Sequence, residues 1–123
     1  MKVLIVDDSQ IMRKIITGVL KKLKVSDIIE AVNGQEAVDK VGENDDIGLV
    51  LMDWNMPTMN GLEAVKKIRA NGSKVPIVMC TTEAEKEKVL EAVKAGTNDY
   101  LVKPFNPKDI QAKLGKFLSA CVS

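Results

Sequence analysis

The sequence predicts an α/β fold in which one parallel sheet is covered by helices on both faces. Five short apolar stretches alternate with segments whose apolar residues recur every three to four positions, the spacing of an amphipathic helix. Strict alternation of strand and helix favours parallel strands, because each helix returns the chain to the same end of the sheet. An unbroken apolar run such as Leu49–Met52 suits a strand buried on both faces.

The first half of the chain contains three predicted strands, at Val3–Val6, Ile28–Ile29 and Leu49–Met52. A helix is predicted over residues 9–23. Asn33 and Glu36 have the spacing of a capping box for a second, weak helix, and Asn60 and Glu63 repeat that spacing for a third. The residues expected to face the core from these helices are Ile11, Met12, Ile15, Ile16, Val19, Leu20, Leu23, Ala37, Val38, Val41, Leu62, Val65 and Ile68.

The second half adds strands at Pro76–Cys80 and Tyr100–Val102. A capping box from Thr82 to Glu85 begins the fourth helix, and Gly96 is its predicted C-cap. Asn106 caps the last helix, with Pro107 in its first turn. The residues expected to be buried from these two helices are Val89, Leu90, Val93, Ile110, Leu114, Phe117 and Leu118. Trp54 is expected to be partly exposed, whereas Cys80 and the methionines, including Met52 and Met79, are expected to fill the core.

Composition excludes several kinds of function. The 123 residues are enough for one domain, and the net charge of +1 provides no signal for nucleic-acid or membrane binding. No apolar stretch approaches transmembrane length, and the 2 cysteines do not form a disulfide framework, so a cytoplasmic protein is expected. The count of 0 histidines excludes a histidine base, a histidine phosphodonor and a His-ligated metal. A metal here would have oxygen ligands, which favours Mg²⁺.

Four of the five predicted strands end in a polar or charged side chain. The residues at these ends are Asp7, Asp8, Asp53, Thr81 and Lys103. Taken singly, each is an ordinary residue with which to end a strand. Because the carboxyl ends of parallel strands lie along one edge of a sheet, the five are expected to converge into one site.

Three carboxylates at one edge repel each other. Two like charges ~4 Å apart cost about 4 kcal/mol at an effective dielectric constant near 20. Either one carboxylate takes up a proton or a cation neutralises the group. The simplest solution is Mg²⁺ bound by Asp8 and Asp53, with Asp7 bound directly or through water. Lys103 supplies a charge for an anion and Thr81 a hydrogen bond, which together predict a phosphoryl-transfer site with Asp53 as nucleophile.

The same residues resemble a known family. Asp7-Asp8, Asp53, Thr81 and Lys103-Pro104 together resemble the response-regulator receiver domain, and the resemblance covers the whole chain. The segments DWNMPTMNG and DYLVKPF look closest to its single-domain chemotaxis regulators. The resemblance implies a flavodoxin-like (βα)5 three-layer sandwich whose five-stranded sheet has the order 2-1-3-4-5. It also implies one receiver domain over residues 1–123, with no attached output domain.

The resemblance implies a phosphorylation-activated signalling switch of a two-component system, which catalyses only its own phosphorylation and dephosphorylation. A histidine kinase of the chemotaxis type would phosphorylate Asp53, and Thr81 and Lys103 would contact the phosphate. The ligands of Mg²⁺ would be Asp7, Asp8, Asp53 and the backbone carbonyl of Asn55. Phosphorylation would shift an equilibrium between two conformers and change one surface. That surface would include Ala84, Lys86, Tyr100, Val102, Phe105, Lys113 and Lys116.

The partner implied by the resemblance is the flagellar motor switch protein, and a phosphatase is left open as a further partner. We expect a monomer that binds neither nucleic acid nor a membrane. The alternative to a partner surface is an ordinary solvated rim. A phosphorelay intermediate, which passes phosphate to a histidine phosphotransferase, would use the same site. A true phosphatase would need a second acid two residues after the nucleophile, where this chain has Asn55.

Overall fold

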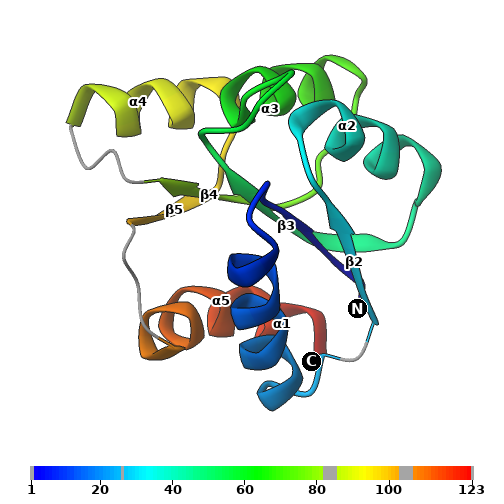
Figure 1. The fold of residues 1–123 in the computed structure, drawn as a ribbon, viewed down its shortest axis with the longest axis vertical. Helices are drawn as coiled ribbons and strands as arrows, with labels where there is room; N and C mark the ends of the chain where they lie inside the picture. The colour runs from blue at the N-terminus through cyan, green and yellow to red at the C-terminus, as the bar shows by residue number, and fades with distance from the viewer. Residues whose placement is uncertain (1, 26, 82–85, 103–106, 123) are drawn as a thin grey trace.

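Strands and helices alternate along the chain (Figure 1). The computed structural model describes residues 2–25, 27–81, 86–102 and 107–122, without the side chains of residues 81, 86, 88, 89, 107 and 116–122. The strands are β1 Lys2–Val6, β2 Asp27–Ala31, β3 Ile47–Asp53, β4 Ile77–Thr81 and β5 Asp99–Val102. The helices are α1 Gln10–Lys22, α2 Gly34–Glu43, α3 Gly61–Ala70, α4 Lys86–Ala95 and α5 Pro107–Val122. Within the described ranges, no helix has both the length and the apolar character needed to cross a bilayer.

The five strands form one sheet of order β2-β1-β3-β4-β5, and every neighbouring pair is parallel. The predicted fold class and strand order are therefore confirmed. Met52 of β3 lies beside Val6 of β1 and Met79 of β4, so these three strands end at one edge. The chain passes from β1 outward to β2 and then back past β1 to β3. In open α/β sheets the crevice at such a reversal, beyond the strand ends, is where ligands bind.

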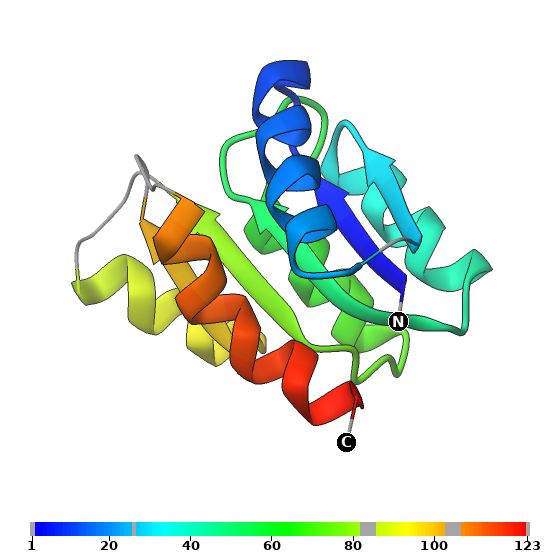
Figure 2. The ribbon, with the colours of Figure 1, turned by 90° about the horizontal axis from the view of Figure 1, so that it is seen from below.

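Helices cover both faces of the sheet. Figure 1 shows α2, α3 and α4 on one face and α1 and α5 on the other, and Figure 2 shows α1 and α5 side by side. Successive strand residues alternate between the two cores, as the pleat of a strand requires. Val3 and Ile5 of β1 pack with α1 and α5, whereas Leu4 and Val6 pack with α2 and α3. This is the predicted three-layer sandwich.

The predicted caps of α2 and α3 are present. The Asn33 side chain accepts a hydrogen bond from the N–H of Glu36 at 2.8 Å, and the Asn60 side chain accepts one from the N–H of Glu63 at 2.9 Å. Gly96 follows α4 with φ +116°, as expected of a glycine C-cap. The capping residues predicted for α4 and α5, at Thr82–Glu85 and Asn106, lie outside the described residues.

Two of the three core positions predicted on α4 are wrong, and the side chain of the third, Val89, is not described. Leu90 and Val93 are 48% and 53% exposed, and the residue that α4 buries among its described side chains is Ala92, at 2%. α4 lies at the end of its layer (Figure 1), where Ala92 and the partly buried Ala95 pack into the core on this side of the sheet. The predicted residues were the large apolar ones of this helix. Size alone does not decide which face of a helix is buried when apolar residues lie at several positions around it.

The apolar stripe of α1 is also wider than its buried face. Ile11 and Ile15 are 73% and 45% exposed, so their predicted core positions are wrong. Buried on this helix are Ile16, Val19 and Leu20. Many of the other predicted core positions are confirmed, since the fully or nearly buried residues include Ala37, Met52, Leu62, Val65, Ile68, Met79, Cys80, Ile110 and Leu114. Four more are only partly buried, namely Met12, Leu23, Val38 and Val41. The side chains of Val89, Phe117 and Leu118 are not described.

Arg69 of α3 holds the segment that joins α4 to β5. Its Nε and Nη2 atoms donate to the carbonyl oxygen of Gly96 at 3.0 and 2.7 Å, and Nη2 also donates to Oδ1 of Asn98 at 3.1 Å. The same Asn98 oxygen accepts the N–H of Ile77 at the start of β4. Burial lowers the pKa of the Arg69 guanidinium from its usual value. The C-terminal end of α4 is therefore tied to α3 and to β4.

Candidate functional site

Three carboxylates meet where β1 and β3 end. Asp53 is the last residue of β3, and Asp7 and Asp8 directly follow β1. One oxygen of each carboxylate lies within 4.8 Å of an oxygen of the others. Asp7 and Asp53 are 2% and 5% exposed, whereas Asp8 is exposed. The structure therefore brings together these three predicted site residues, with two acids buried and one open to solvent.

The residues of this cluster fit a hard cation. At 4.8 Å and an effective dielectric constant near 20, each pair of ionised carboxylates repels by about 3.5 kcal/mol. A bound divalent ion removes that repulsion, and carboxylate oxygens are the ligands that Mg²⁺ prefers. The exposed Asp8 carboxylate leaves a path from solvent, and Mg²⁺ bound by carboxylates keeps positions for water or phosphate oxygens.

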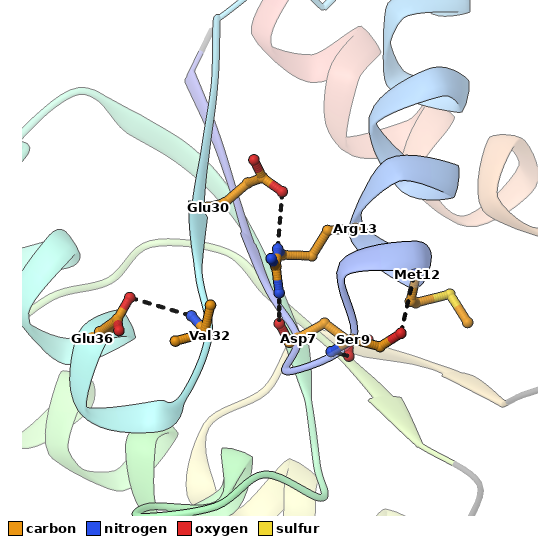
Figure 3. Close-up of polar contacts among 7 residues, drawn as sticks. All are labelled: Asp7, Ser9, Met12, Arg13, Glu30, Val32 and Glu36. Atoms are coloured by element: carbon orange, nitrogen blue, oxygen red, sulfur yellow. Dashed lines mark hydrogen bonds and ion pairs between the residues drawn. The ribbon is translucent and has the colours of Figure 1, made fainter.

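The main chain around Asp7 is held by groups that the sequence analysis did not single out (Figure 3). Ser9 N–H donates to Asp7 Oδ1 at 2.9 Å, and Arg13 Nη1 donates to the Asp7 carbonyl oxygen at 2.7 Å. Arg13 Nε also donates to Oε1 of Glu30 on β2, at 3.0 Å. The Asp7 N–H donates to the carbonyl oxygen of Ala31 at 3.1 Å. In the sequence, Arg13 looks like any basic residue on an amphipathic helix, so no local signal marks it.

The loop after Asp53 turns back onto the start of α3. Trp54 N–H donates to the Cys80 carbonyl oxygen at 3.0 Å, and Gly61 N–H donates to the Trp54 carbonyl oxygen at 2.8 Å. Thr58 lies in the left-handed region with φ 68°, which is uncommon for a β-branched residue. The backbone beside Asp53 is therefore tied to β4 and to α3.

Trp54 is buried rather than partly exposed, which corrects the prediction. It is 7% exposed and belongs to the core between the sheet and α2–α4, together with Met59 and Leu62. Because the loop doubles back onto α3, the indole next to Asp53 joins that core. A large aromatic side chain gains more from such burial than from lying over a polar site.

Two glycines allow helices to approach this loop closely. A Cβ atom on Gly61 would lie 2.2 Å from the carbonyl oxygen of Asp53. A Cβ atom on Gly34 would lie 2.4 Å from the carbonyl oxygen of Met59. The first residues of α2 and α3 thus pack directly against the backbone that follows β3. Any side chain at either position would have to displace main-chain atoms.

The remaining predicted site residues are placed only in part. Thr81 is the last residue of β4 and lies beside Val102, the last residue of β5. Its side chain is not described, and Lys103 lies outside the described residues. Asn55 is exposed, two residues beyond Asp53. The backbone thus brings the end of β4 to the same edge as the acids.

The predicted partner surface is described around β5 and α5. The Nζ atom of Lys113 lies 5.0 Å from the centre of the Tyr100 ring and 3.0 Å from Oδ1 of Asp99. Tyr100, Val102 and Lys113 line a hollow of about 380 Å³ between this strand and helix. Ala84 and Phe105 lie outside the described residues, and the side chains of Lys86 and Lys116 are not described.

The family of the chain follows from comparison with known proteins. Residues 3–115 match the model of the response regulator receiver domain. The chain belongs to this family, as the resemblance in its strand-end residues implied.

Curated relatives and solved structures agree with this assignment. The chain is 49% identical over 116 residues to the chemotaxis protein CheY1 of Helicobacter pylori strain J99. This match covers 93% of this chain and 94% of that protein. It is 50% identical over 116 residues to the chemotaxis protein CheY homolog of Campylobacter jejuni strain 81-176, covering 93% and 89%. The structure of Vibrio cholerae chemotaxis protein CheY4 is 36% identical, with a TM-score of 0.85 over 94% of this chain and 97% of that chain. A Francisella response regulator 1452 receiver domain is 25% identical, with a TM-score of 0.89 over 98% of both chains.

Proposed function

We propose that this chain is a phosphorylation-activated switch of a two-component system that controls chemotaxis. The observation that carries the proposal is the meeting of Asp7, Asp8 and Asp53 at the strand ends on either side of the sheet reversal. Such a site needs to do little covalent chemistry, because phosphoryl transfer depends mainly on positioning and on neutralising charge. A chain that belongs to the receiver family and carries this cluster is suited to take up a phosphoryl group.

In the proposed reaction, one carboxylate oxygen of Asp53 attacks the phosphorus atom of a phosphohistidine on a kinase. An oxygen–phosphorus bond forms, and the bond between phosphorus and the histidine nitrogen breaks. Bound Mg²⁺ would supply charge neutralisation for the phosphate oxygens. Its ligands would be Asp7, Asp8, Asp53 and the carbonyl of Asn55. Thr81 and Lys103 would contact the transferred group, with the lysine offering a compact charge.

The proposed output is the binding of a partner at the surface around Tyr100 and Lys113. We propose a histidine kinase as the phosphodonor and the flagellar motor switch protein as the partner, both in the cytoplasm. The chemotaxis names of the two curated relatives support this choice, and those relatives match over 94% and 89% of their own lengths. The receiver domain would act by docking on this partner.

Addition of Mg²⁺ is expected to raise the melting temperature of the chain and to change the fluorescence of Trp54, which adjoins Asp53. Replacing Asp8 with asparagine removes one anionic ligand and should weaken Mg²⁺ binding at least about tenfold. Titration calorimetry measures the affinity. Asp45→Asn is the matched control, because Asp45 is exposed before β3, at the other end of that strand. Equal weakening by both substitutions would contradict the site, since it would reflect net charge alone.

Phosphorylation is expected to increase affinity for a peptide of the flagellar motor switch protein by about 5- to 150-fold, the typical range of coupling between two sites. The chain is treated with acetyl phosphate and binding is followed by fluorescence anisotropy. Tyr100→Ala should reduce this increase in affinity. Val32→Ala should not, because Val32 follows β2, the outer strand on the opposite side of the sheet from β5. Transfer of the phosphoryl group to a histidine phosphotransferase, with no gain in peptide affinity, would instead identify a phosphorelay intermediate.

A further inference from the structure

Arg13 joins the end of β1, where Asp7 lies, to β2, an outer strand of the sheet. Its side chain is only 13% exposed although it lies near the start of a surface helix. One nitrogen, Nη1, donates to the carbonyl oxygen of Asp7 at 2.7 Å, and another, Nε, donates to Glu30 at 3.0 Å (Figure 3). The planar guanidinium can serve both oxygens at once because its donors point in fixed directions.

Hydrogen bonds support three groups of Asp7. Its N–H donates to Ala31, its carbonyl oxygen accepts from Arg13, and its carboxylate accepts from the N–H of Ser9. Mg²⁺ requires nearly ideal octahedral geometry, so small errors in the position of a ligand weaken binding. If Arg13 were shortened, the carbonyl oxygen of Asp7 would lose a charge-assisted hydrogen bond. Because Asp7 is buried, that loss would not be made good easily by water.

The charge of Arg13 acts in the opposite direction. A guanidinium near a cation site repels the cation, and the Glu30 carboxylate offsets that repulsion only in part, since it is half exposed. If charge decided, removal of Arg13 would strengthen Mg²⁺ binding. If support of the Asp7 backbone decides, removal of Arg13 weakens it. The sign of the change therefore separates the two effects.

We propose that Arg13 is a positioning residue of the metal site, which holds the backbone of Asp7 in the conformation that binds Mg²⁺. Glu30 on β2 holds Arg13 in turn. The inference rests on the proposed function, because it concerns the Mg²⁺ site assigned there. It gives the edge strand β2, which carries none of the three acids, a part in the affinity of the site.

The test is the affinity for Mg²⁺, measured by titration calorimetry on the purified chain. Arg13→Met is expected to weaken binding about tenfold, as loss of a group that orients a metal ligand does. Arg13→Lys should weaken binding several-fold, because a single ammonium replaces a guanidinium that donates from two nitrogens to two different oxygens. Lys14→Met removes the same charge from the next, exposed position of α1 and should change binding less than twofold.

A second control separates positioning from general loss of stability. Arg69→Met removes another arginine with several backbone and side-chain partners, in the last turn of α3, whereas the backbone of Asp53 adjoins the first residue of that helix. It should lower the melting temperature and leave Mg²⁺ affinity within twofold of the wild-type value. In the metal-free protein, Arg13→Met should also speed hydrogen exchange at the N–H of Ser9, which donates to Asp7.

Binding by Arg13→Met that is as tight as wild type, or tighter, would overturn the inference, as would equal weakening by Arg69→Met. Neither result would contradict the proposed Mg²⁺ site of the wild-type chain. Failure of the wild-type chain itself to bind Mg²⁺ would overturn both the inference and the proposed metal site. If Arg13→Met does not fold, Arg13→Lys and Glu30→Gln provide the test, and unchanged affinity in both would overturn the inference.

Discussion

Replacement of Asp53 with asparagine is expected to lower the rate of phosphoryl uptake from acetyl phosphate by at least about a thousandfold. The amide keeps the shape of the side chain but lacks the charge of the nucleophile and of a metal ligand. Intact-mass spectrometry measures the effect, with one phosphoryl group expected per wild-type molecule. Because asparagine fits the same space, the fold should persist, so the loss can be assigned to chemistry.

The control is Asp27→Asn, which makes the same change at an exposed residue. Asp27 is the first residue of β2 and therefore lies at the opposite edge of the sheet from the acids. This variant should take up one phosphoryl group at the wild-type rate. Uptake of phosphate by Asp53→Asn at a rate close to that of the control would show that another residue is the acceptor.

Alanine at position 61 is expected to lower the free energy of unfolding by about 2–4 kcal/mol, a large effect for one added methyl group. The new Cβ would stand 2.2 Å from the carbonyl oxygen of Asp53, and that atom belongs to the backbone. The strand end or the helix must therefore move, which would also break the hydrogen bond from Gly61 N–H to Trp54. Urea unfolding measures the stability, and Mg²⁺ affinity should fall with it.

Gly18→Ala is the matched comparison, because Gly18 lies inside α1 with no atom within 4 Å of an added Cβ. Alanine is the better helix former, so this change should raise the free energy of unfolding by about 0.5–1 kcal/mol. Opposite signs for the two substitutions are the expected result. A Gly61→Ala protein as stable as wild type would mean that α3 does not approach Asp53 as closely as the structure has it.

The sheet and its acids could be predicted because they depend on patterns that repeat along the chain. Alternation of apolar runs and amphipathic segments indicates parallel strands, and parallel strands bring Asp7 and Asp53 to one edge. The strand order came from the family resemblance, because alternation alone does not say on which side of β1 the chain continues.

Features that depend on close approach in three dimensions could not be predicted in the same way. In the sequence, Gly61 lies between the two residues of a predicted capping box. No local pattern indicated that a backbone oxygen would lie where a side chain at this position would be. Arg13 is one of 18 basic residues, and its two partners are six and seventeen positions away. Trp54 was misplaced for the same reason, since its burial follows from a loop that returns to α3.

The fastening of the C-terminal end of α4 has a consequence for how the molecule fluctuates. Arg69 joins α3 to Gly96 and Asn98, and the same Asn98 oxygen accepts the N–H of Ile77 at the start of β4. Local opening at this end of α4 must break these hydrogen bonds together, so the Gly96 end should open only when its contacts with α3 and β4 open as well.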